Sequence, residues 1–192
     1  LRVPKAKKRK KRRLPGKAQG TQHRRAQRPN EVWAYDFVSD ETRDGRRLKI
    51  LVVEDEFTRE CLAIEVRRSF RARDVQAVLA RLFAERGVPA HLRSDNGPEF
   101  IAKALQMWLA EQGLSTLYIK PGSPWQNAFS ESLNNRVRDE LLNTELFASL
   151  LEAQVLAADW RARYNREHPH SALGMQSPHA FAGRWPAPGP RS

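Results

Sequence analysis

The sequence predicts an α/β fold in which helices flank a mixed sheet. Three apolar, strand-like segments at 32–38, 48–53 and 61–66 follow one another closely, separated by turn-like stretches rich in Asp, Glu, Arg and Gly. Beyond residue 75, segments whose apolar residues recur at helical spacing alternate with short strands. Close succession favours an antiparallel meander for the first three strands, and the alternation favours parallel strands added to it.

Capping and stopping residues mark the helices. Gly87 and Gly113 each follow a segment with helical periodicity, and Pro98 can start the second of these after a short strand at 91–94. A strand is expected at 116–119. Ser123 followed by Pro124 then predicts a third helix that begins near Pro124.

A capping box predicts the last long helix. Ser149 and Glu152 have the Ser-x-x-Glu spacing in which the two side chains satisfy each other's free backbone N–H groups, and the helix should run towards Tyr164. We expect its core residues to be Leu151, Val155 and Leu156.

Charge divides the 192 residues into an arm and a domain. Residues 1–29 hold 13 Lys and Arg and no acid, whereas residues 30–192 hold 21 Lys and Arg against 22 acids. We expect a disordered basic arm at 1–29, one globular domain at 30–182 and a loose Pro- and Gly-rich tail at 183–192. The arm suits a polyanion such as DNA, although a solubility tail or linker remnant has the same composition. Its densest cations are Lys7, Lys8, Arg9, Lys10, Lys11, Arg12 and Arg13.

The remaining composition excludes several classes of protein. Cys61 is the only cysteine, so the chain has neither an intramolecular disulfide framework nor a cysteine-rich zinc site. No apolar run approaches the ~18 residues that a membrane span needs. We therefore expect a protein of the reducing cytoplasm, associated with the nucleoid if it binds DNA, and no membrane partner.

Three carboxylates carry the chemistry. Asp36 lies in an apolar strand, Asp95 follows the strand at 91–94, and Glu131 lies on the third helix. Each has an ordinary explanation alone, as an exposed strand residue, a turn residue or a solvent-facing helix residue. Together they form a set of hard oxygen donors suited to Mg²⁺ or Mn²⁺. Two such ions can hold the attacking and leaving oxygens of a phosphoryl displacement.

Polar residues share the helical face of Glu131. Asn127, Asn134, Asn135 and Arg138 lie at offsets of −4, +3, +4 and +7 from it, so all are expected on one side of the helix, towards DNA. An offset of seven corresponds to ~10 Å along the axis, which places Arg138 near backbone phosphates and away from the metal. The alternative for Arg138 is an ordinary ion pair with a neighbouring acid.

Four motifs together resemble the catalytic core of bacterial insertion-sequence transposases, closest to the insertion-sequence-three family (OrfB products), which is also similar to retroviral integrase. They are Trp33-x-x-Asp36-Phe37, the Ser94 to Phe100 segment, Gln126 to Ser132, and Tyr164-Asn165 with Pro169 to Gly174. The resemblance covers about residues 30–182.

The resemblance implies a ribonuclease H-like fold with Asp36, Asp95 and Glu131 as an Asp-Asp-Glu triad. It also implies divalent metal, DNA strand cleavage by water, and strand transfer by the freed 3′-hydroxyl. Chemistry on two DNA ends makes an assembly of at least two copies plausible. The competing hypotheses are a nuclease that cuts without joining, and a truncated, inactive product that only binds DNA or partner subunits.

Two features fit the family less directly. Its members usually carry a helix-turn-helix region before the core, whereas only the basic arm precedes the domain here, so we do not expect this fragment alone to recognise specific element ends. His168 and His170 are spaced as His-Pro-His, but no third ligand follows at a recognisable spacing. A structured turn is the expected role of this motif.

Overall fold

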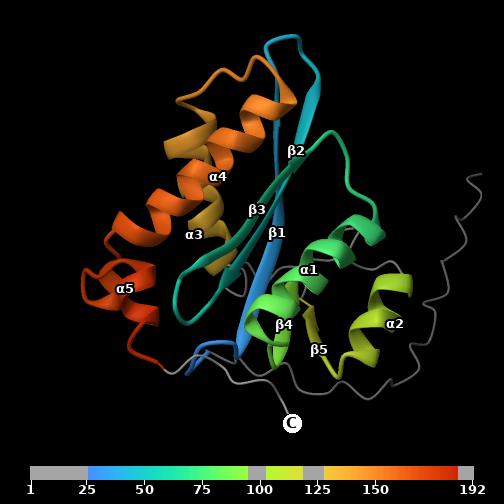
Figure 1. Ribbon diagram of the computed structural model, residues 1–192, viewed down its shortest axis with the longest axis vertical. Helices are drawn as coiled ribbons and strands as arrows, with labels where there is room; N and C mark the ends of the chain where they lie inside the picture. Colours follow the sequence, from blue (N-terminus) through green and yellow to red (C-terminus); the bar gives the residue numbers. More distant parts are fainter. Residues whose placement is uncertain (1–25, 95–102, 119–127, 186–192) are drawn as a thin grey trace, which may run out of the picture.

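A five-stranded mixed sheet forms the centre of the structure, with helices on both of its faces (Figure 1). The computed structural model describes residues 26–94, 103–118 and 128–185. The strands are β1 (Val32–Glu41), β2 (Arg47–Asp55), β3 (Cys61–Arg67), β4 (His91–Ser94) and β5 (Ser115–Tyr118). Their order across the sheet is β3-β2-β1-β4-β5; the first three are antiparallel, and β4 and β5 are parallel additions. The predicted fold class is confirmed.

The helices form a layer on each side of the sheet. The described helical segments are α1 (Ala72–Arg86), α2 (Lys103–Glu111), α3 (Ala128–Val137), the π-helical segment η2 (Arg138–Leu142), α4 (Leu150–Glu167), the short 3₁₀ segment η3 (Ser171–Leu173) and α5 (Pro178–Ala182). Helices α1 and α2 cover one face, and α3 and α4 cover the other.

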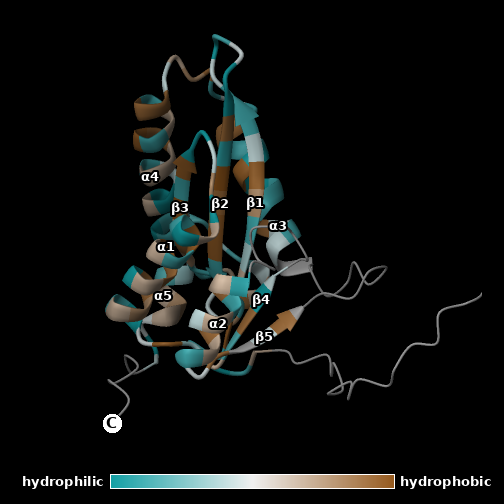
Figure 2. Ribbon diagram, turned by 90° about the vertical axis from the view of Figure 1, so that its right-hand side faces the viewer, coloured by the Kyte–Doolittle hydropathy of each residue, from teal (hydrophilic) through white to brown (hydrophobic). Residues whose placement is uncertain are grey.

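The pleat of β1 divides its side chains between two cores. Trp33 and Tyr35 are buried among residues of α1 and α2, whereas Val38 is buried among residues of α3 and α4. Figure 2 shows the apolar residues of β2 and of parts of β1, the central strands that contribute to both cores. Because successive side chains of a strand point to opposite faces, Asp36 belongs to the α3 and α4 side.

Several predicted boundaries are confirmed. The strand expected at 91–94 has these bounds in the structure. Gly87 ends α1 with a φ of 77°, which favours glycine, and its N–H donates to the Phe83 carbonyl at 2.9 Å. The helix starts expected at Pro98 and Pro124 lie outside the described residues.

The predicted core of α4 is wrong at Leu151 and Val155, whereas Leu156 is partly buried against the core and the predicted cap is correct. Ser149 Oγ accepts a hydrogen bond from Glu152 N at 3.1 Å. Leu151 and Val155, however, are 69% and 59% exposed. The buried stripe instead consists of Ala153, Ala157, Trp160 and Tyr164. Both stripes have helical spacing, and the alanines are small enough for α4 to approach β3 closely.

The packed part of the chain extends beyond residue 182. Trp185 packs edge-on against Phe57, with ring centroids 5.1 Å apart, so at least the first residues of the expected tail belong to the domain. At the other end Ala26 is buried, four residues before the expected boundary. Among the described helices, none has the length and apolar character needed to cross a membrane.

Candidate active site

Asp36 lies in the middle of β1, on the strand at the centre of the sheet. Its carboxylate is half-buried and held at both oxygens: Oδ1 accepts from the Phe37 N–H at 2.7 Å, and Oδ2 accepts from Asn134 Nδ2 at 2.8 Å. Hydrogen bonds to both oxygens fix the orientation of a carboxylate. The structure therefore contains an oriented carboxylate that faces α3.

The contact with Asn134 brings the helix of Glu131 to Asp36. Asn134 is only 3% exposed, and its amide spans the two elements. Glu131 lies three residues earlier on the same helix and is exposed. Residues at this spacing are neighbours on a helix surface, about 5–6 Å apart at their Cβ atoms. Glu131 is thus one helical turn from a residue bonded to Asp36.

Asn135, near the end of α3, and Arg138, the first residue of η2, lie side by side. Arg138 Nη1 donates to Asn135 Oδ1 at 3.5 Å, the long limit of a hydrogen bond, and both side chains are exposed. The DNA contacts predicted for Asn134, Asn135 and Arg138 stay predictions. For Asn134, the contact in the structure is with Asp36.

Asp95, Asn127 and the seven dense cations of the arm lie outside the described residues. The strand that leads to position 95 is described, and it pairs in parallel with β1: Arg93 lies opposite Ala34. Ser94, the last described residue of β4, is buried. The sheet therefore places the end of β4 level with the part of β1 that carries Asp36.

The donor set near Asp36 fits a hard divalent cation. Two acidic side chains, Asp36 and Glu131, are brought towards each other by β1 and α3, and carboxylate oxygens are the donors that Mg²⁺ and Mn²⁺ prefer. Within the described ranges no cluster of three His, Cys, Asp or Glu side chains could hold a metal. Two of the three predicted ligands lie in the described part of the chain, and their role as ligands stays a prediction.

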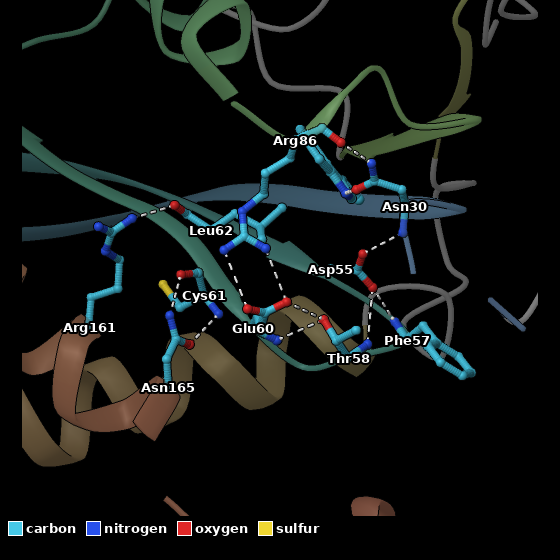
Figure 3. A network of polar contacts seen from close by, with 11 residues as sticks. Asn30, Asp55, Phe57, Thr58, Glu60, Cys61, Leu62, Arg86, Arg161 and Asn165 are labelled. Carbon is cyan, nitrogen blue, oxygen red and sulfur yellow. Dashed lines mark hydrogen bonds and ion pairs between the residues drawn. The ribbon is translucent and has the colours of Figure 1, made fainter. Parts of the chain in front are cut away.

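A second acidic region, the turn between β2 and β3, is buried. Figure 3 shows the hydrogen bonds of two of its acids, Asp55 and Glu60. Asp55 accepts from the backbone N–H groups of Asn30, Phe57 and Thr58 at 2.7, 2.8 and 3.0 Å. Glu60 pairs with both terminal nitrogens of Arg86 at 3.1 and 3.3 Å. These carboxylates serve the structure of the turn.

Comparison with known protein families identifies the family of this chain. The family described as "Integrase core domain" matches residues 26–124, and a second family of the same description matches residues 112–178. The chain belongs to the integrase core domain family.

Proteins of bacterial insertion elements are similar to this integrase core domain. It is 42% identical over 157 residues to an uncharacterized 39.2 kDa protein of insertion element IS476 from Xanthomonas euvesicatoria, covering 82% of this chain and 45% of that protein. It is 43% identical over 156 residues to a 31.7 kDa protein of IS407 from Burkholderia multivorans, covering 81% and 56%. A transposase for insertion sequence element IS904 from Lactococcus lactis is 26% identical over 162 residues, covering 82% and 63%. The chain spans about half the length of the first two relatives.

Solved integrase structures share its fold. The simian T-cell lymphotropic virus intasome, in complex with PP2A regulatory subunit B56 gamma, contains a chain that superposes with a TM-score of 0.72 at 16% identity, covering 88% of this chain and 60% of that one. The HTLV-2 integrase catalytic core domain in complex with magnesium gives 0.63 at 14% identity, covering 81% and 98%. The fold is ribonuclease H-like, as the resemblance implied.

The sequence-based prediction missed the role of Asn134 beside Asp36. The available signal was its spacing of three from Glu131, which indicated a shared face but not the partner across the helix–sheet interface. The buried carboxyl of Glu54 was also missed. Its signal was an acid that directly follows the apolar run Leu51-Val52-Val53 of a central strand.

Proposed function

We propose that this integrase core domain is the catalytic core of an insertion-sequence transposase of the insertion-sequence-three, OrfB type. It cleaves DNA strands and joins the freed 3′-hydroxyl to target DNA. The observation that supports this most strongly is the Asn134–Asp36 hydrogen bond at 2.8 Å, because it brings the helix of Glu131 against the central strand of an integrase core. Asp95 follows Ser94 directly in the sequence and completes the proposed triad.

In this mechanism Asp36, Asp95 and Glu131 hold divalent metal, Mg²⁺ or Mn²⁺, with two ions as the expected number. Bound metal supplies Lewis-acid stabilisation of the phosphoryl oxygens and a lower pKa for the attacking water or hydroxyl. The protein contributes positioning: Asn134 fixes Asp36, and β1 and α3 fix the separation of the carboxylates. No covalent protein nucleophile is required.

DNA is the proposed substrate and partner, contacted by the basic arm, Arg138, Asn135 and Asn127. The relatives belong to insertion elements of bacteria, and the solved neighbours include an intasome and a dimeric integrase core. We therefore place the active form on bacterial DNA, in the cytoplasm, as an assembly of at least two copies.

The decisive test is an assay that separates cutting from joining. Wild-type protein with Mg²⁺ or Mn²⁺ should nick labelled DNA and also yield joined product, whereas Asp36→Asn, Asp95→Asn and Glu131→Gln should abolish both and leave the fold and DNA binding intact. Near-normal turnover of any of the three variants would remove that residue from the triad. Nicking without joining would favour a nuclease, and DNA binding without nicking in either metal would favour the inactive product.

A further inference from the structure

A pocket of about 260 Å³ adjoins the helix that carries Glu131. Its walls come from the β2 end and the following turn, from α3, from α4 and from the turn after the His-Pro-His motif. The lining residues are Glu54, Arg59, Ser132, Leu133, Arg136, Tyr164, His170, Ser171 and Ala172. The space is several times what one water molecule needs.

Three of the residues that line this pocket have buried polar atoms in need of a partner. Glu54 Oε1, Arg136 Nε and His170 Nε2 are buried, and none of them has a hydrogen-bond partner among the described residues. Glu54 is the most enclosed, with 3% of its surface exposed. Buried polar groups in folded proteins are nearly always satisfied, so three such atoms around one pocket indicate a missing polar occupant.

The charges of the lining residues favour an anion. Burial raises the pKa of Glu54 to about 8, so near neutral pH its carboxyl is largely protonated and can donate a hydrogen bond. Burial, and the charge of His168 next to it, lower the pKa of His170 to about 4, so that imidazole is neutral. The cations are Arg59 and Arg136. Arg136 Nη1 forms an ion pair at 3.4 Å with Glu140, which is an exposed residue.

The walls of the pocket are held in place before any ligand binds. Arg59 has a left-handed backbone, with φ at 63°, and its N–H donates to the Asp55 carbonyl at 2.9 Å. Asn165 of α4 bonds both backbone groups of Cys61, at 2.8 and 2.9 Å. The His170 N–H donates to the Gln176 carbonyl at 3.0 Å, which closes the turn. Such preorganisation lowers the entropic cost of binding.

The pocket shares helix α3 with the proposed active site. Ser132 follows Glu131 in the sequence, and Arg136 lies one turn beyond Ser132. Because successive helical residues point about 100° apart, these two residues present a different side of α3 from Glu131. Arginine is the residue best suited to phosphate, because its planar guanidinium donates two parallel hydrogen bonds.

We propose that this pocket binds a backbone phosphate of the DNA substrate, through Arg136 and Arg59 with Glu54 and His170 as neutral partners. The inference rests on the proposed function, since it takes DNA as the substrate. It gives the His-Pro-His turn a role in binding the substrate backbone.

The test measures DNA affinity without metal, by fluorescence anisotropy of a labelled duplex in EDTA over a range of KCl concentrations. Arg136→Gln and Arg59→Gln should each weaken DNA binding about tenfold. Each should also reduce the slope of log K against log[KCl] by about 0.9, the change expected for one lost phosphate contact. Arg163→Gln is the matched control. It removes the same charge from an i,i+4 ion pair on α4, with Asp159 at 3.0 Å, away from this pocket, and should leave the slope unchanged.

A second arm distinguishes DNA phosphate from a free phosphate. At constant ionic strength, inorganic phosphate should compete with DNA more strongly for the wild-type protein than for Arg136→Gln. The proposal is overturned if both folded pocket variants, checked by thermal unfolding, keep the wild-type slope, or if Arg163→Gln changes it equally. It is also overturned if inorganic phosphate stabilises the wild-type protein without displacing DNA. If these results overturn it while the wild type still nicks and joins DNA, only this inference fails; loss of all DNA binding by the wild type would refute the proposed function itself.

Discussion

Removing the Asn134 amide should slow catalysis without weakening DNA binding. Asn134 is 3% exposed and donates to Asp36 Oδ2 at 2.8 Å, so Asn134→Ala leaves one oxygen of the proposed metal ligand without its protein donor. Hydrogen bonds to charged groups contribute about 1.5–3 kcal/mol. Since about 1.36 kcal/mol corresponds to a tenfold change in rate, turnover should fall about ten- to a hundredfold, the usual range for groups that orient a metal ligand.

The assay is strand cleavage in a Mn²⁺ titration, beside DNA affinity measured without metal. Asn135→Ala is the matched control, because the neighbouring amide is exposed and its described side-chain partner is Arg138, at 3.5 Å. Asn134→Ala should raise the metal requirement and lower turnover at saturating DNA, while Asn135→Ala, at a proposed DNA contact, should act on DNA affinity and leave the metal requirement near wild type. Wild-type turnover for Asn134→Ala, or an equal loss in both variants, would refute the claim that this hydrogen bond orients Asp36.

Three further perturbations test other parts of the structure. Burial raises the folded-state pKa of Glu54 from 4.5 to about 8. The free energy of unfolding of the wild type relative to Glu54→Gln, measured with urea, should therefore be highest below pH 4.5 and fall by about 1.4 kcal/mol per pH unit up to about pH 8. A difference in unfolding free energy that does not change with pH would show that the carboxyl has the same pKa in the folded and unfolded states. The fully buried Glu56 side chain pairs with Arg93 at 2.6 Å, so Arg93→Ala should lower the free energy of unfolding by about 3–5 kcal/mol. Arg81→Ala removes an exposed pair with Glu65 and should lower it by at most about 1 kcal/mol. Equal unfolding midpoints for the two variants would contradict this. Deleting residues 1–25 removes most cations of the arm but keeps the buried Ala26, so DNA affinity should fall about equally for all sequences and its salt dependence should flatten; an unchanged salt slope would show that the arm does not contact phosphate.

Local patterns in the sequence were sufficient for most of the fold. The close succession of three apolar segments predicted the antiparallel meander, and the strand at 91–94 was placed correctly between turn-forming residues. Gly87 and Ser149 marked helix ends because a left-handed backbone and a free N–H group each favour particular residues regardless of the rest of the chain. The spacing of Glu131, Asn134 and Asn135 likewise predicted a shared helical face.

Tertiary structure decided which of the possible contacts form. Helix α4 has two apolar stripes, and only packing on β3 determines that Ala153 and Trp160 are buried while Leu151 is exposed. The partner of Asn134 is Asp36, which lies more than 75 positions away in the sequence. The protonation of Glu54 depends on its burial by several elements at once. A one-dimensional pattern records the periodicity of each element, but distances and desolvation arise only when the elements pack together. For that reason the sequence by itself determined the elements and the candidate carboxylates, whereas the orientation of Asp36 and the polar pocket beside α3 were determined by the folded chain.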